Sequence, residues 1–249
     1  MLLLFVIFGF IVQMFFFSRV YKNRTEGNKY HLDSLMSYML CFSALGLLCI
    51  VKLTLDVYPP FILVIFLRYM VFIFLYCHIR SVLTKKKAKA PVFMYCFLGL
   101  LLVTYIFNIS GFSVVKNRLL PNLGFILIDY DTVANYKDLA LLYFLVSFVT
   151  IVVTLKMFFT YSRSKLFNLY ANKEKSKIKY WTSTYIFLVL FNFVIVFVAS
   201  RFTNGTVPLI GLVYIGGLLV ESYFLSLNPV YLGYLVNNTR KTWMGSKQF

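Results

Sequence analysis

The sequence predicts an all-α membrane protein that crosses the bilayer seven times, with its N-terminus outside and its C-terminus in the cytoplasm. Of the 249 residues, 61% are hydrophobic and only 13% are charged, whereas soluble domains carry about 25% charged residues. Apolar segments fill nearly the whole chain. Lys and Arg gather in alternate connecting segments, as expected when positive loops stay in the cytoplasm.

The third span fixes the orientation of the others. Residues 61–82 are long enough, at about 33 Å of helix, to cross the hydrocarbon core. The cations Lys85, Lys86, Lys87 and Lys89 follow this span, and such a cluster marks a cytoplasmic end. Arg68 lies inside the same span, where a charged side chain is costly and needs a structural or functional reason.

Six further apolar segments complete the predicted topology, at residues 1–17, 35–55, 92–108, 139–159, 180–199 and 209–227. Basic residues follow the first segment rather than precede it, unlike in a cleaved signal peptide, so we expect an uncleaved helix. Asp33 and Ser34 suit the start of the second helix. Asn228 and Pro229 end the seventh, because proline disfavours helix in the residue before it. The membrane domain covers residues 1–229, and residues 230–249 form a short cytoplasmic tail at the membrane interface.

The positions of Lys and Arg support this topology. Of the 25, 19 fall in predicted cytoplasmic segments, four in exterior loops, and two, Lys52 and Arg68, in the membrane. The formal net charge of +17 is therefore explained by topology and contact with anionic lipid rather than by nucleic acid. We expect membrane lipid and an unidentified membrane or cytoplasmic protein as partners, with no direct nucleic-acid contact. A homodimer is an open alternative.

Residues suited to catalysis or metal binding are sparse. The two histidines belong to no Cys/His cluster with metal-ligand spacing, and no nucleophile has an evident base beside it. We therefore expect no enzymatic activity, no cofactor and no metal, with a cation between Asp129 and Asp131 as the weighed alternative. All four cysteines fall in apolar segments, so no disulfide is expected.

The charged residues in the membrane give a candidate ligand site. Measured from the turn at Pro59, Lys52 and Arg68 lie at similar depth, about 11 to 13 Å below the outer end. Asp56 lies one turn after Lys52 and can pair with it, and Glu221 in the seventh span is the natural partner of Arg68. Two interpretations are open: a pocket for an anionic or polar ligand, or a structural network that fixes helix packing. The residues assigned to ligand binding are Lys52, Asp56, Arg68, Tyr69 and Glu221.

The cytoplasmic tail carries a candidate partner-binding surface. It combines an apolar side with an aromatic anchor, which suits contact with either a protein or the lipid headgroups. The residues assigned to partner binding are Tyr231, Leu232, Tyr234, Leu235 and Trp243.

Four segments carry a resemblance to a known family: LGLLCIVKLTL (45–55), FLRYMVFIFLYCHIRSVL (66–83), NLYANKEKSKIKYWTSTYIFLVLF (168–191) and SYFLSLNPVYLGYL (222–235). In order and character they resemble the seven-helix membrane sensor half of bacterial membrane-bound AraC-type transcription regulators. The resemblance implies signal sensing in the bacterial cytoplasmic (inner) membrane. Those regulators continue into a helix-turn-helix domain, and the 22 residues from Asn228 onward cannot fold two DNA-reading helices. The DNA-binding role is therefore not carried over.

We predict an integral membrane signal sensor that passes a signal from outside to a separate cytoplasmic output protein. The alternative is a structural or accessory membrane subunit of a larger complex, such as a secretion or transport machine. A transporter ranks third, because the sequence shows no convincing internal repeat or paired broken helices.

Overall fold

The computed structural model describes residues 2–22, 24, 29–84, 87–110 and 137–162, with single positions at 176, 180, 183, 184, 186 and 187. Within these residues the chain forms helices and no strand, which confirms the all-α prediction for this part of the chain. The helices are α1 (Leu2–Lys22), α2 (Lys29–Leu55), α3 (Phe61–Thr84), α4 (Val92–Ile109) and α6 (Lys137–Ser162).

Four of the described helical segments have the length and composition needed to cross a membrane. They are Leu32–Leu55, Phe61–Thr84, Val92–Ile109 and Leu141–Thr160, and they match the second to fifth predicted spans. Helix α1 covers the first predicted span and continues to Lys22. The sixth and seventh predicted spans, the loop with Asp129 and Asp131, and the tail lie outside the described residues.

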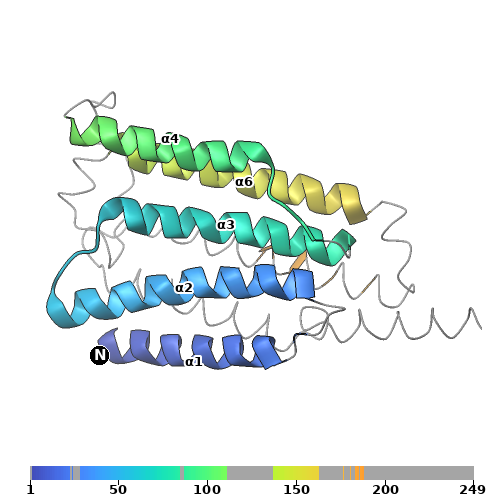
Figure 1. Cartoon of the computed structure of the whole chain (residues 1–249), viewed down its shortest axis with the longest axis horizontal. Coiled ribbons are helices and arrows are strands. Elements are labelled where there is room, and N and C mark those ends of the chain that lie inside the picture. Colours follow the sequence, from blue (N-terminus) through green and yellow to red (C-terminus); the bar gives the residue numbers. More distant parts are fainter. Residues whose placement is uncertain are drawn as a thin grey trace, which may run out of the picture.

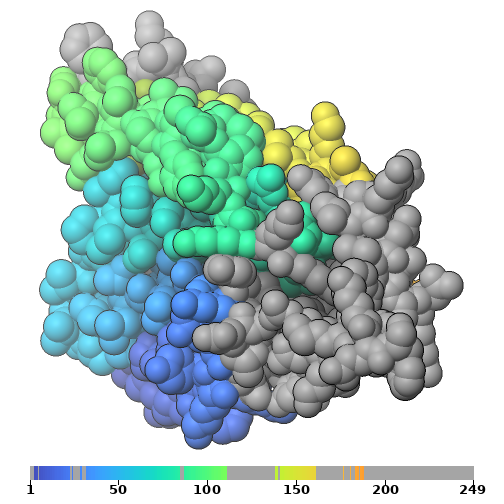
Figure 2. Space-filling model, turned by 45° about the vertical axis from the view of Figure 1, so that its right-hand side comes forward, coloured from blue at the N-terminus to red at the C-terminus, as the bar shows by residue number. Residues whose placement is uncertain are grey.

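The helices form a bundle in which α2, α3 and α4 each run antiparallel to the helix before them (Figure 1). Helix α3 is the centre of the described bundle, since it packs against α2, α4 and α6. In the apolar segment of α3, 67% of the residues are buried, whereas in the apolar segment of α4 only 11% are buried. Helix α4 therefore lies at the periphery and turns large apolar side chains outward (Figure 2).

Prolines define where two of the helices begin. At the start of α3 the backbone N–H of Leu63 donates to the carbonyl of Pro60 over 3.0 Å. At the start of α4 the backbone N–H of Met94 donates to the carbonyl of Pro91 over 3.0 Å. Proline is tolerated at these positions because the first helical turn has no partner for its missing N–H. Both helices begin where the sequence predicts.

The predicted start of α2 at Asp33 and Ser34 is wrong, because the helix begins at Lys29, one turn earlier. The Asp33 carboxylate instead pairs with Arg24 in the segment between α1 and α2. Arg24 Nε lies 2.7 Å from one carboxylate oxygen, and Nη2 donates to the other over 3.3 Å. Asp33 therefore binds a side chain from the preceding connection, and its own backbone is helical.

One end of the bundle is strongly basic. The C-terminal ends of α1 and α3 and the N-terminal ends of α2 and α4 lie together at this end (Figure 1). We call it the basic end; its cations include Arg19, Lys22, Arg24, Lys29, Arg80, Lys87 and Lys89. Arg80 Nη1 also donates to the backbone carbonyl of Lys89 over 3.1 Å, which ties the connection between α3 and α4 to α3.

Candidate functional site

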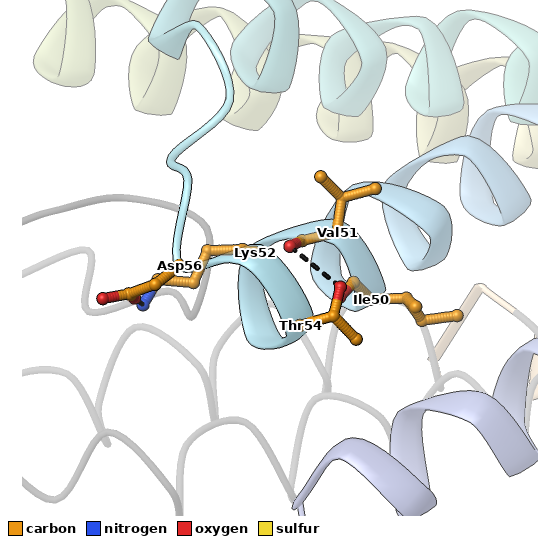
Figure 3. A network of polar contacts seen from close by, with 5 residues as sticks. All are labelled: Ile50, Val51, Lys52, Thr54 and Asp56. Atoms are coloured by element: carbon orange, nitrogen blue, oxygen red, sulfur yellow. Dashed lines mark hydrogen bonds and ion pairs between the residues drawn. The ribbon is translucent and has the colours of Figure 1, made fainter.

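Lys52 and Asp56 form an ion pair at the C-terminal end of α2, as the sequence predicts. Lys52 Nζ donates to Asp56 Oδ1 over 2.7 Å, and the two side chains lie together in Figure 3. The Lys52 side chain is 16% exposed and that of Asp56 is 88% exposed. The Lys52 ammonium also lies 4.3 Å from the centre of the Tyr58 ring. At this distance the cation is attracted to the face of the aromatic ring in a cation–π interaction.

The backbone explains why this pair lies at the helix end. Asp56 has a φ of 53°, in the left-handed region where glycine is favoured and aspartate is tolerated. Its N–H donates to the Lys52 carbonyl over 2.9 Å, which is the usual bond of a left-handed helix cap. A carboxylate here faces the negative end of the helix dipole, and the Lys52 ammonium compensates for this. Hydrogen bonding to Lys52 and its charge lower the pKa of Asp56 below its ordinary value.

The last turn of α2 has a second polar contact. Thr54 Oγ1 donates to the Ile50 carbonyl over 2.8 Å and approaches the Val51 carbonyl at 3.2 Å (Figure 3). The two carbonyls lie four and three residues before Thr54, the usual positions for a threonine hydroxyl that bonds back to its own helix. This contact therefore holds the Thr54 side chain against the last turn of α2.

Arg68 lies in the interior of the bundle. It is 6% exposed, and it interacts electrostatically with Cys49 on α2 and with Tyr143 on α6. Helix α3, which carries Arg68, packs against both α2 and α6. An arginine inside a membrane segment is rare and is held facing the bundle interior when it occurs.

Tyr69, the next residue, connects α3 to α6. It is fully buried, and its hydroxyl lies 3.0 Å from Thr150 Oγ1. Thr150 donates its own proton to the Val146 carbonyl over 2.8 Å. A threonine hydroxyl has one proton to donate, so the Tyr69 hydroxyl is the donor in the contact between the helices. Arg68 and Tyr69 are thus both buried polar residues of α3, and the Tyr69 hydroxyl contacts α6.

Helix α6 presents a row of hydroxyl groups that the sequence analysis missed. Its members recur every three or four residues, the spacing that keeps side chains on one helix face. All four are buried. We call this row the hydroxyl face of α6; it consists of Tyr143, Ser147, Thr150 and Thr154. The spacing could have been found in the sequence, since these are polar positions within an otherwise apolar span.

The predicted ligand site is only partly assembled in the described residues. Lys52 is paired with Asp56 at the end of α2, whereas Arg68 and Tyr69 face the interior and α6. Glu221 lies outside the described residues, as do all the predicted partner-binding residues of the tail. In the part of the chain that the structure describes, no group of three His, Cys, Asp or Glu side chains is arranged to hold a metal ion.

Comparisons with protein-family models, with curated proteins and with solved structures find no match to this chain. The resemblance to the sensor half of AraC-type regulators therefore stays a prediction.

Proposed function

We propose that this chain is a non-enzymatic signal sensor of the bacterial inner membrane. The observation that carries the proposal is the burial of Arg68 among three helices of a bundle built from membrane-length segments. Placing an arginine at the centre of a membrane helix costs about 2.5 to 3.5 kcal/mol on insertion scales. Recognition of a ligand would explain why an arginine stands there despite this cost. The ligand would be an anionic or polar molecule from outside.

The proposed topology has seven spans, with the N-terminus outside and the C-terminus in the cytoplasm. It is supported by the basic end, where cations from two separate connections come together. Dense Lys and Arg favour the cytoplasmic side, so this end faces the cytoplasm and the turn between α2 and α3 faces outward. The outward apolar side chains of α4 suit contact with lipid tails.

Signalling would follow from a change in helix arrangement. A ligand shifts a conformational equilibrium only when it binds one state better than the other. Arg68 lies between helices, so a ligand there contacts α3 together with α2 or α6. The connections at the basic end are short, and the signal would leave by contact with a separate output protein. The proposed contact surfaces are the tail residues and the basic segment 163–179.

The test of this proposal is affinity purification of the tagged full chain in a mild detergent, with identification of the proteins that accompany it. A sensor should bring along a cytoplasmic protein with a regulatory or DNA-binding output domain. Purification of the chain alone, reproduced after chemical cross-linking in intact cells, would contradict a sensor that works through a separate partner.

The alternative is a structural subunit of a larger membrane complex. The Lys52–Asp56 pair and the Tyr69–Thr150 contact favour it, because both are complete without a ligand. In this alternative Arg68 pairs with Glu221. Removing one partner of a buried pair costs about 3 to 5 kcal/mol, so Arg68→Gln and Glu221→Gln should each destabilise the protein and the double variant should cost less than their sum. Additive losses would favour the sensor.

A further inference from the structure

The hydroxyl face of α6 lies against the Arg68 region and has no assigned role. Tyr143 and Ser147 are one turn apart on this face, and both are buried. Tyr143 interacts electrostatically with Arg68. The next member of the face, Thr150, is bonded to Tyr69, which immediately follows Arg68 in α3. Arg68 and Tyr69 of α3 thus lie beside two turns of the hydroxyl face of α6, from Tyr143 to Thr150.

Ser147 supplies a second, independent observation. Its side chain is fully buried, and its Oγ has no hydrogen-bond partner among the residues the structure describes. The Tyr143 hydroxyl lies close enough to interact with it, although the pair does not reach hydrogen-bond geometry. A buried hydroxyl without a partner is costly. Ser147 is therefore poised to contact a further group between α3 and α6.

We propose that the Arg68 site binds an oxyanion, a carboxylate or a phosphate, and that Tyr143 and Ser147 of α6 are further ligand-binding residues. The inference rests on the proposed sensor function, in which Arg68 recognises the ligand, and it adds the ligand class and the second helix.

The chemistry of the three groups selects an anion. A guanidinium offers five N–H donors and no acceptor, and a fork of two N–H groups matches a carboxylate or phosphate edge. The hydroxyls of Tyr143 and Ser147 can donate to the same oxygens. Thr150 cannot, because its proton goes to the Val146 carbonyl. A donor-rich cluster with one positive charge binds an oxyanion better than a cation or a neutral amine.

Binding at this place also moves α6. Arg68, Tyr143 and Ser147 are all buried, so an oxyanion reaches them only when α3 and α6 separate slightly. The ligand therefore favours a different arrangement of α6, which leads directly into the basic segment 163–179. Ligand binding would therefore change the packing of α3 against α6.

The experiment uses the purified full chain in an uncharged detergent. Thermal unfolding is followed with a thiol-reactive dye, because buried thiols such as Cys49 and Cys77 become reactive on unfolding. Acetate, inorganic phosphate and a short-chain phosphatidylglycerol are each titrated against chloride at constant ionic strength. We expect a saturable rise in the unfolding midpoint with at least one of them. A rise with acetate or phosphate identifies a soluble ligand, and a rise with phosphatidylglycerol alone identifies a lipid headgroup. If the unfolding midpoint rises with none of the three compounds, the proposal that the site binds an oxyanion is overturned.

Conservative variants test the contribution of α6. Arg68→Gln should abolish the rise. Tyr143→Phe and Ser147→Ala should each weaken binding roughly 10-fold or more, the loss expected for one hydrogen bond to a charged group. Tyr76→Phe is the matched control, since it removes a buried tyrosine hydroxyl about 12 Å along α3 from Arg68 and should leave binding unchanged.

Retention of wild-type binding in both Tyr143→Phe and Ser147→Ala overturns the role of α6, even when Arg68→Gln abolishes binding. If Arg68→Gln does not fold, the two α6 variants still decide the question. Failure of the sensor proposal is distinguishable, because binding is measured on the chain alone and needs no output protein.

Discussion

Asp56 and Lys52 close the end of α2 by two bonds in opposite directions. The Asp56 N–H donates to the Lys52 carbonyl over 2.9 Å, and Lys52 Nζ donates to the Asp56 carboxylate over 2.7 Å. The first bond requires a left-handed backbone at Asp56, with φ at 53°. The second neutralises a carboxylate at the negative end of the helix dipole. The turn into α3 therefore depends on one residue for both its backbone conformation and its charge.

This arrangement predicts a loss of stability in acid. Lys52 lowers the pKa of Asp56 below its ordinary value of 3.8, so the pair stabilises the folded protein above that value and loses its effect as the pH falls through the lowered pKa. Asp56→Asn should lower the unfolding midpoint slightly at pH 7, and its midpoint should converge with that of the wild type in strong acid. Asparagine keeps a side chain that tolerates the left-handed backbone, so the charge alone is tested. An equal difference at every pH would mean that the ion pair contributes nothing.

The Tyr69–Thr150 contact predicts coupling between α3 and α6. Tyr69→Phe should destabilise the protein in detergent by roughly 0.6 to 1.7 kcal/mol, the range of hydrogen bonds between membrane helices. Thr150→Val should cost a similar amount, and the double variant should cost less than the sum. Thr104→Val on the peripheral helix α4 is the matched control, because within the described residues the Thr104 hydroxyl bonds the Leu100 carbonyl of its own helix and no other helix. Purely additive losses at Tyr69 and Thr150 would show that the contact does not join the helices.

Hydropathy and charge were sufficient to predict the described helices. Long apolar runs indicated α2, α3, α4 and α6, and the prolines before Phe61 and Val92 marked two starts correctly. The start of α2 was predicted wrongly because Asp33, a residue that favours helix N-caps, instead forms an ion pair with Arg24. Arg24 lies nine residues before Asp33, and the local sequence does not indicate which of the two interactions is more favourable.

The site was predictable only where its contacts are local. Lys52 and Asp56 are one helical turn apart, so their pairing follows from spacing. The neighbours of Arg68 belong to α2 and α6, and no pattern in the sequence states which face of α6 meets α3. The spacing of Tyr143, Ser147, Thr150 and Thr154 marks a polar face, but the partner of that face requires the packed structure.

The orientation predicts the behaviour of topology reporters. Fusions after Lys87 and after Lys175 should report a cytoplasmic location, and a fusion near Asn122 should report an exterior one, because the proposed topology places the basic end in the cytoplasm. Paired reporters that are active on opposite sides of the membrane give an internal control. A cytoplasmic result near Asn122 would remove or add a span before that position and would overturn the seven-span topology.

We propose that the signal leaves the membrane through a protein contact made by the tail. The most direct test compares the proteins that accompany the full chain with those that accompany a version truncated after Asn228, both purified in mild detergent at matched membrane levels. Loss of the partner from a normally inserted truncated chain is the predicted result, since residues such as Tyr231, Leu235 and Trp243 would form the contact. Full retention of the partner would contradict coupling by the tail and would transfer that role to the basic segment 163–179.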